Sequence, residues 1–189
     1  MIERGYFGRA LQIVGSDPGL YVMGGLLLQI LSLMTGGLLV GPAICGICYV
    51  TIRRLRGEEV TFADVFKGFD NFANALVAGV VWALMLAVGL TLFVVPGIIL
   101  GALFCFVFPF IVDRDMPLPE ALAASRRIAQ QDLLAWGSFF LLALLVGVSG
   151  VILCVVGVMF TWPLMWATVA VAYEDVVGPG RRDANRSAS

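Results

Sequence analysis

Two of the four cysteines, Cys45 and Cys48, have the spacing of a redox or metal-binding pair. A metal site of this kind needs a second pair of ligands, and the sequence has no histidine to contribute to one. The pair also lies inside a long apolar segment, as do Cys105 and Cys154. We therefore predict that the cysteines are small buried side chains and that the chain uses no metal or cofactor.

The absence of histidine also removes the commonest general base and proton shuttle. Every Asp, Glu, Lys and Arg falls in one of four segments, which run from Glu3 to Asp17, Arg53 to Asp70, Asp113 to Asp132 and Glu174 to Arg186. Enzymes and ion-coupled transporters in membranes usually depend on ionisable side chains at membrane depth. We therefore expect a protein that is not an enzyme. A net charge of −1 gives no reason to expect a nucleic-acid partner.

The charged segments separate three charge-free stretches, Pro18 to Ile52, Asn71 to Val112 and Leu133 to Tyr173. Apolar residues make up 60% of the chain and charged residues 13%, whereas soluble domains are about a quarter charged. As one helix, the middle stretch would measure about 63 Å, twice the ~30 Å hydrocarbon core of a bilayer. Each stretch is therefore predicted to cross a membrane, turn and return as a helical hairpin.

Glycine and proline mark where each hairpin turns. We place the hairpins at about residues 19–54, 73–113 and 133–175, with turns near Gly36, at Pro96-Gly97 and near Gly157. For the third turn, Gly147 to Gly150 is an alternative. For the first stretch, one long tilted helix or a wedge in the near leaflet is an alternative to a full hairpin. The turn or kink residues near the starts of the second arms are Pro42, Pro96 and Pro163.

A short amphipathic helix is predicted before each hairpin. The first covers Ile2 to Val14, and the third covers Glu120 to Gln131. The second follows Thr61 and Asp64, which have the spacing of a capping box. The predicted fold is thus an all-α integral membrane protein with six transmembrane helices arranged as three hairpins. Residues 1–178 form one membrane domain, and residues 179–189 are expected to be a disordered tail.

All Lys and Arg residues lie between the apolar stretches, so the positive-inside rule puts both termini in the cytoplasm. Arginines at the ends of the stretches are candidates for contact with anionic lipid headgroups, although they are also explained by topology alone. Small residues at intervals of four predict faces for close helix packing, within one chain or between copies. The candidate headgroup residues are Arg53, Arg54, Arg56, Arg126 and Arg127, and the candidate packing residues are Gly37, Gly41, Ala75, Gly79, Ala83, Ala87, Gly97 and Gly101.

Several short motifs follow one another along the chain. They are Gly41-Pro42 with Gly46, Arg56-Gly57-Glu58, Phe66 to Phe69, Pro96-Gly97-Ile98, Pro109 with Asp113, Glu120-Ala121-Leu122 with Ser125, Pro163, and Ala172 to Asp175 with Gly178. In their order and spacing, these motifs resemble a large group of bacterial membrane proteins, the YciC-like families and the membrane domain attached to some glycerophosphoryl diester phosphodiesterases. The resemblance covers about residues 10–178 and implies a six-helix module of the bacterial inner membrane, with no catalytic residues.

Two functions are compatible with this sequence. The leading hypothesis is a non-enzymatic module that organises lipids or partner proteins, because amphipathic helices beside hairpins can wedge one leaflet and bend a membrane. The alternative is a passive channel or small-solute transporter, formed by one chain or an oligomer. Membrane lipids are the expected partners, and a second copy of the chain or another membrane protein is a further candidate. The candidate pore-lining residues are Asn74, Thr91, Thr161 and Thr168.

Overall fold

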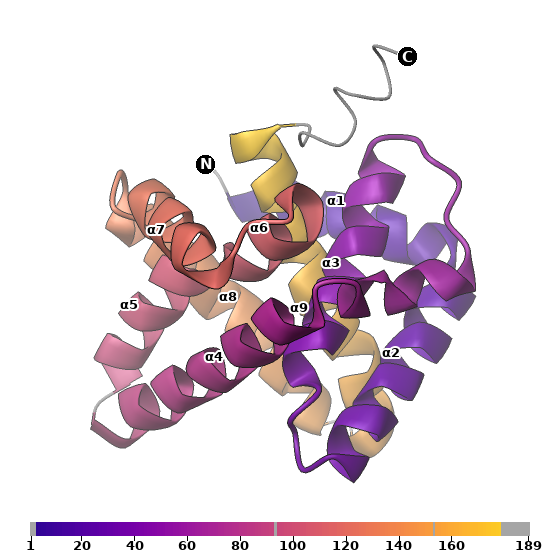
Figure 1. Ribbon diagram of the computed structural model, residues 1–189, viewed down its shortest axis with the longest axis horizontal. Coiled ribbons are helices and arrows are strands. Elements are labelled where there is room, and N and C mark those ends of the chain that lie inside the picture. The colour runs from indigo at the N-terminus through magenta and orange to yellow at the C-terminus, as the bar shows by residue number, and fades with distance from the viewer. Residues whose placement is uncertain (1–2, 93, 153, 179–189) are drawn as a thin grey trace.

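A computed structural model of the chain describes residues 3–92, 94–152 and 154–178, and within these ranges the chain is helical and contains no strand (Figure 1). The predicted all-α class is therefore confirmed. The helices are α1 (Glu3–Ser16), α2 (Pro18–Met34), α3 (Val40–Leu55), the 3-10 helix η1 (Phe62–Phe69), α4 (Phe72–Leu92), α5 (Val94–Phe104), α6 (Val107–Arg114), α7 (Leu118–Ala129), α8 (Leu133–Ile152) and α9 (Cys154–Val177).

Several of these helices are apolar enough to cross a membrane. Among the described residues, the segments Phe72–Gly89 and Pro96–Arg114 each meet the length and hydropathy expected of a span. The number rises from 2 to 4 when each of two bent helix pairs is taken as one span. The structure thus agrees with an apolar helical protein that associates with membranes, while the six spans stay a prediction.

The first hairpin turns at two glycines. Helix α2 begins at Pro18, and the Asp17 side chain caps it by accepting a hydrogen bond from the N–H of Leu20 at 3.2 Å. Between α2 and α3, Gly36 and Gly37 have φ angles of +64° and +87°, which L side chains rarely adopt. The glycines thus allow the tight reversal at the position where the sequence predicted it.

The second hairpin differs from the prediction in its turn and in its second arm. Helix α4 ends at Leu92 and α5 begins at Val94, so Pro96 and Gly97, where the turn was predicted, lie inside α5. The arm was expected to be one helix over residues 97–113, but it is divided into α5 and α6 by a break at Cys105 and Phe106. The Ser125 hydroxyl, from α7, accepts a hydrogen bond from the N–H of Phe106 and donates one to the carbonyl of Leu103 at 2.8 Å. This serine satisfies backbone groups that a continuous helix would pair internally, so the break is stable although it is buried.

The third hairpin corrects two predictions. Helix α8 continues to Ile152 and α9 begins at Cys154, and residue 153 between them lies outside the described residues. Gly157 and the alternative stretch Gly147 to Gly150 are both helical. Pro163 lies inside α9 instead of near its start. A glycine in an apolar helix can allow close packing as readily as a turn, and Gly147 lies against the side chain of Met165 on α9.

Short helices precede all three hairpins, as predicted. The angle between α1 and α2 is 93°, and the angle between α7 and α8 is 109°. Both short helices therefore run roughly at right angles to the arms that follow them. The segment before the middle hairpin is a 3-10 helix, and the Asp64 carboxylate accepts hydrogen bonds from the N–H and hydroxyl of Thr61 at its start. The predicted tail, residues 179–189, lies outside the described residues.

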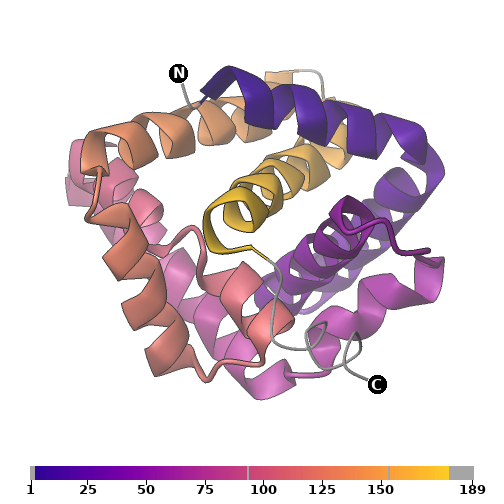
Figure 2. The same ribbon diagram turned by 90° about the horizontal axis from the view of Figure 1, so that it is seen from above.

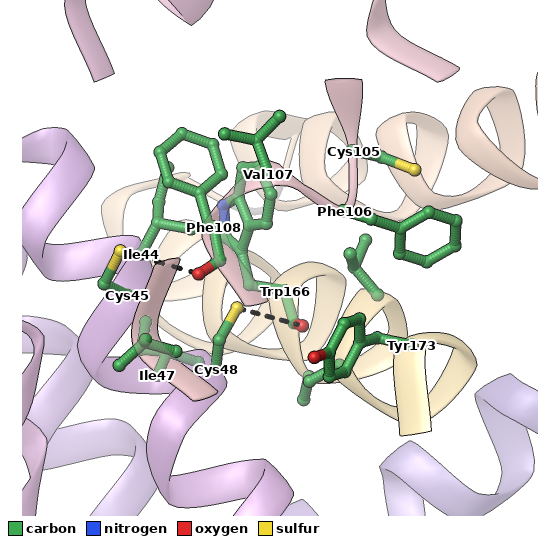
Figure 3. Packing of buried hydrophobic residues seen from close by; sticks show 14 of the residues in the cluster. Ile44, Cys45, Ile47, Cys48, Cys105, Phe106, Val107, Phe108, Trp166 and Tyr173 are labelled. Atoms are coloured by element: carbon green, nitrogen blue, oxygen red, sulfur yellow. Dashed lines mark hydrogen bonds between the residues drawn. The ribbon is translucent and has the colours of Figure 1, made fainter. Parts of the chain in front are cut away.

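Helix α9 runs through the middle of the molecule, and Figure 2 shows the other helices arranged around it. Its segment from Met165 to Tyr173 is buried on all sides, which fits a helix that is apolar around its whole circumference. Small residues at positions 167, 170 and 172 let neighbouring helices approach it closely. Large side chains pack from α3, α6 and α8, and Figure 3 shows Phe108 and Trp166 in edge-to-face contact with ring centroids 5.2 Å apart.

Candidate functional site

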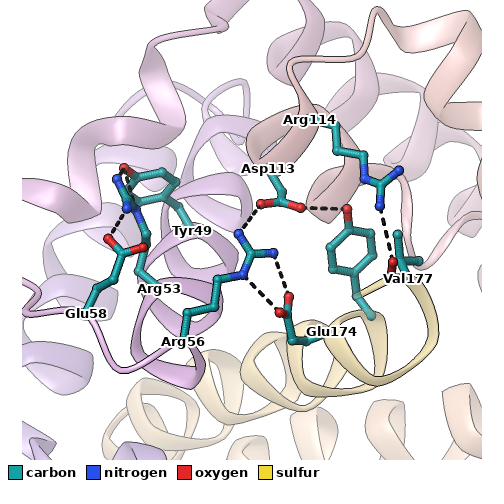
Figure 4. A network of polar contacts seen from close by, with 9 residues as sticks. Tyr49, Arg53, Arg56, Glu58, Asp113, Arg114, Glu174 and Val177 are labelled. Atoms are coloured by element: carbon teal, nitrogen blue, oxygen red, sulfur yellow. Dashed lines mark hydrogen bonds and ion pairs between the residues drawn. The ribbon is translucent and has the colours of Figure 1, made fainter. Parts of the chain in front are cut away.

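The last residues of the three second arms meet at one end of the molecule, which we call the charged end. There, Arg56 forms ion pairs with Asp113 at 2.8 Å and with Glu174 at 2.7 Å (Figure 4). The hydroxyl of Tyr173 donates a hydrogen bond to the second carboxylate oxygen of Asp113 at 2.9 Å. Because these residues come from the first, second and third hairpins, one arginine joins all three units.

This cluster is largely shielded from water. The side chains of Arg56, Asp113 and Glu174 are 11%, 5% and 14% exposed, respectively. Burial alone would lower the pKa of the Arg56 guanidinium, but its hydrogen bonds to Glu174 and Asp113 outweigh burial and raise its pKa. The planar guanidinium donates from Nε and Nη2 to the two oxygens of Glu174, a fork that lysine cannot reproduce. Arg56 is thus a structural cation, permanently charged.

The other two candidate headgroup residues at the end of α3, Arg53 and Arg54, also have partners within the protein. Arg54 pairs with Asp17 at 2.7 Å and donates to the hydroxyl of Ser16, which ties the end of α3 to the bend between α1 and α2. The hydrogen bond from Arg54 lowers the pKa of the Asp17 carboxyl, and the hydrogen bond from the N–H of Leu20 lowers it further. Arg53 pairs with Glu58. The structure therefore commits Arg53, Arg54 and Arg56 to the protein and leaves them poorly placed for lipid headgroups.

Arg126 and Arg127 on α7 have the opposite environment. Both are exposed, and neither side chain forms a hydrogen bond or ion pair within the described part of the chain. On the same helix, Ala121, Ser125 and Ala129 are buried at intervals of four residues. Helix α7 therefore packs through a narrow face of small residues and presents its two arginines outward.

Exposed aromatic rings line η1 and the start of α4. Phe62, Phe66 and Phe72 are about 40% exposed (41%, 39% and 44%). Together with Phe69 they form a row in which successive ring centroids are 6.3 Å, 6.2 Å and 6.2 Å apart. Val65, on the opposite side of η1, is buried against α2 and α3. This row of phenylalanines, which we call the Phe row, is a continuous apolar edge next to charged loops.

The predicted packing residues divide into contacting and exposed positions. Gly41 on α3 lies so close to α4 that an added Cβ would overlap the backbone of Ala75, and Gly79 faces the same crossing. Nothing lies within 4 Å of a Cβ built on Gly37, which serves the turn instead. Gly97 lies against Gly89, and Gly101 lies against the ring of Phe140. Ala83 and Ala87, by contrast, are exposed on α4. Pro42 and Pro96 lie in the first turns of α3 and α5.

The Cys45 and Cys48 thiols point into the core. Their sulfur atoms lie 3.9 Å from the carbonyl oxygen of Phe108 and 4.0 Å from that of Trp166 (Figure 3). Both side chains are free thiols and are at most 1% exposed. Within the described residues, no cluster of three or more potential metal-ligating side chains occurs. The pair therefore packs α3 against α6 and α9.

Sequence reasoning missed the cluster around Arg56. The available signal was positional: Arg56, Asp113 and Glu174 all lie within a few residues of the end of an apolar stretch. Three equivalent ends in a bundle of hairpins necessarily face the same side, so opposite charges there can pair.

No protein-family model matches this chain, and neither a curated protein nor a solved structure shows significant similarity to it.

Proposed function

We propose that this protein is a non-enzymatic module of the bacterial inner membrane that organises lipids by inserting short helices into one leaflet. The observation that carries the proposal is the near-perpendicular bend between two of the short helices and the arms that follow them, 93° for α1–α2 and 109° for α7–α8. If the arms run along the membrane normal, these short helices lie in the plane of the interface.

Arm lengths support membrane insertion as three hairpins. Helices α4 and α8 contain 21 and 20 residues, which correspond to about 30 Å, the thickness of the hydrocarbon core. Helix α2 has 17 residues, about 25 Å, at the short end of the range for a span. The charged end then faces the cytoplasm with both termini, in accordance with the positive-inside rule.

The Phe row is the part of the protein surface that we expect to enter the membrane interface. Phenylalanine rings that stand half out of a segment that also carries charged side chains gain free energy when they enter the boundary between headgroups and acyl chains. The rings of Phe62, Phe66 and Phe72, which follow the loop after α3, would occupy area in one leaflet only. Unequal area in the two leaflets favours curvature.

Helix α7 adds an electrostatic contribution. Arg126 and Arg127 are exposed and without ion-pair partners in the described chain, so their charges are available to anionic headgroups. Each basic residue near an anionic membrane surface contributes about 1 kcal/mol. We therefore expect the two arginines to enrich anionic lipids around α7, and this enrichment should weaken at high salt.

Reconstitution into liposomes tests the proposal. The purified protein should reduce vesicle diameter or produce tubules as the protein-to-lipid ratio rises, as seen by cryo-electron microscopy. The double variant Phe62→Ser/Phe66→Ser should need several-fold more protein for the same effect, whereas Phe62→Leu/Phe66→Leu should stay close to wild type. Unchanged vesicle shape and lipid packing over a wide range of protein-to-lipid ratios would refute the proposal.

A further inference from the structure

A cavity of about 160 Å³ lies between α2, α3 and α9, toward the end of the first hairpin that carries the glycine turn. It is partly open to the outside. Most of its wall is apolar and includes Leu28, Val40, Ile47 and the indole of Trp162. Gly25 and Gly37 also border the cavity; a Cβ on Gly37 would meet nothing within 4 Å, whereas one on Gly25 would overlap Pro163.

Ser32 is the unusual member of this wall. It is 6% exposed, and its hydroxyl has no hydrogen-bond partner among the described residues. A serine inside an apolar helix ordinarily donates to the carbonyl four residues earlier. Thr35, one turn further along the chain, shows that pattern by donating to Leu31 at 3.0 Å. The Ser32 hydroxyl is therefore a buried polar group that faces a cavity without a partner.

Gln29 lies one helical turn before Ser32 and borders the same cavity. Its half-buried amide makes no hydrogen bond within the described part of the chain. A glutamine amide and a serine hydroxyl can each donate and accept. The two side chains thus give an apolar cavity one polar edge, with both donors and acceptors available.

We propose that this cavity binds the hydroxyl-bearing end of an uncharged, long-chain lipid molecule. Its hydroxyl would exchange hydrogen bonds with Ser32 and Gln29, and its first carbons would pack against Trp162 and the aliphatic wall. None of the described residues that line the cavity is charged, so a charged headgroup would lose its hydration without a counter-ion. This binding site goes beyond lipid organisation by the interfacial helices, although it rests on the proposed contact with lipid.

The size of the cavity fits the end of a lipid and excludes a whole one. An apolar cavity of about 150 Å³ holds a molecule the size of benzene. The rest of the chain must therefore leave through the open side. Leu33, Met34 and Leu38, next to the cavity, are 76%, 81% and 49% exposed and continue the apolar surface outward. This surface provides a path for an acyl or alkyl chain into the surrounding membrane.

Photo-crosslinking in detergent tests this inference without any need for membrane curvature. The probe is a sixteen-carbon alcohol with a diazirine near its hydroxyl end and an alkyne at the other, and labelled peptides are mapped by mass spectrometry. We expect labels on α2, on α3 or around Trp162. Unlabelled hexadecanol should compete at least about tenfold better than hexadecane, because loss of one or two hydrogen bonds in an apolar site corresponds to that factor or more.

The matched variants are Ser32→Leu, which fills the cavity and removes the hydroxyl, and Ser149→Leu, which makes the same change on the exposed surface of α8. Ser32→Leu should lose most of the label and Ser149→Leu should retain it. Equal competition by hexadecane, or full labelling of a folded Ser32→Leu variant, would overturn the inference. A folded protein that fails this test could still shape vesicles, so the two proposals are separable.

Discussion

Replacement of Arg56 by methionine is the sharpest test of how the three hairpins are held together. The substitution keeps most of the side-chain volume and removes the guanidinium that pairs with Asp113 and Glu174. Two carboxylates that are 5% and 14% exposed then remain close together without a cation. Since both are far less than a third exposed, solvent screening offsets little of the cost.

Removal of one partner from a buried ion pair typically costs about 3–5 kcal/mol, because it leaves an uncompensated charge. We expect Arg56→Met to destabilise the protein by about this amount, a large part of the roughly 5–15 kcal/mol of a typical domain. Addition of Asp113→Asn and Glu174→Gln should reduce the loss by more than half, since the stranded charges are then gone.

Equilibrium unfolding in mixed micelles, followed by tryptophan fluorescence as sodium dodecyl sulfate is added, measures these free energies of unfolding. Arg126→Met serves as the control, because Arg126 is exposed and lacks an ion-pair partner in the described chain. Its effect should stay within about 0.5 kcal/mol. If Arg56→Met costs no more than the control, or if the triple variant is less stable than the single one, the Arg56 cluster does not join the hairpins as described.

Three further predictions concern packing, pH and cysteine reactivity. Gly41→Leu should destabilise the protein by at least about 3 kcal/mol in the same unfolding assay, because α3 and α4 must separate to make room for the side chain. Gly137→Ala should instead stabilise the protein by about 0.5–1 kcal/mol, because the space around its Cβ position is open. Hydrogen bonds from Thr61 hold the pKa of Asp64 below its ordinary 3.8. The stabilising effect of the Asp64 carboxylate is therefore complete above pH 3.8 and is lost as the pH falls through the lower pKa of the folded state. Acid titrations of the stability of wild type and Asp64→Asn should differ in this pH range. A maleimide should label Cys48 only after unfolding, and labelling in the native state would contradict its burial.

Local signals in the sequence were enough for several boundaries. Asp17 with Pro18 starts α2, two glycines end the first arm, and Asp64 caps η1, and each signal lies within a few residues of the boundary that it sets. The short helix predicted over residues 120–131 is α7, shifted by about two residues. Such features follow from neighbouring residues alone, so a single sequence contains the information needed to predict them.

Features that depend on distant residues were beyond such reasoning. The break between α5 and α6 is satisfied by Ser125, which is 19 and 22 residues away from its two backbone partners. Gly157 carried a turn signal, but apolar helices also use glycine for packing, and the sequence does not separate the two uses. The fold class was predictable, whereas the partner of each candidate arginine required the arrangement of all the helices.

The Arg56 cluster also has a consequence for the order in which the protein is assembled. Ribosomes make the chain from its N-terminus, and the carboxylates that pair with Arg56 follow it by 57 and 118 residues. A nascent chain that has formed only its first hairpin therefore lacks both of the carboxylates that pair with Arg56. The charge of Arg56 is balanced first by Asp113 and then by Glu174, so the three hairpins are joined only after the segment that carries Glu174 has been made.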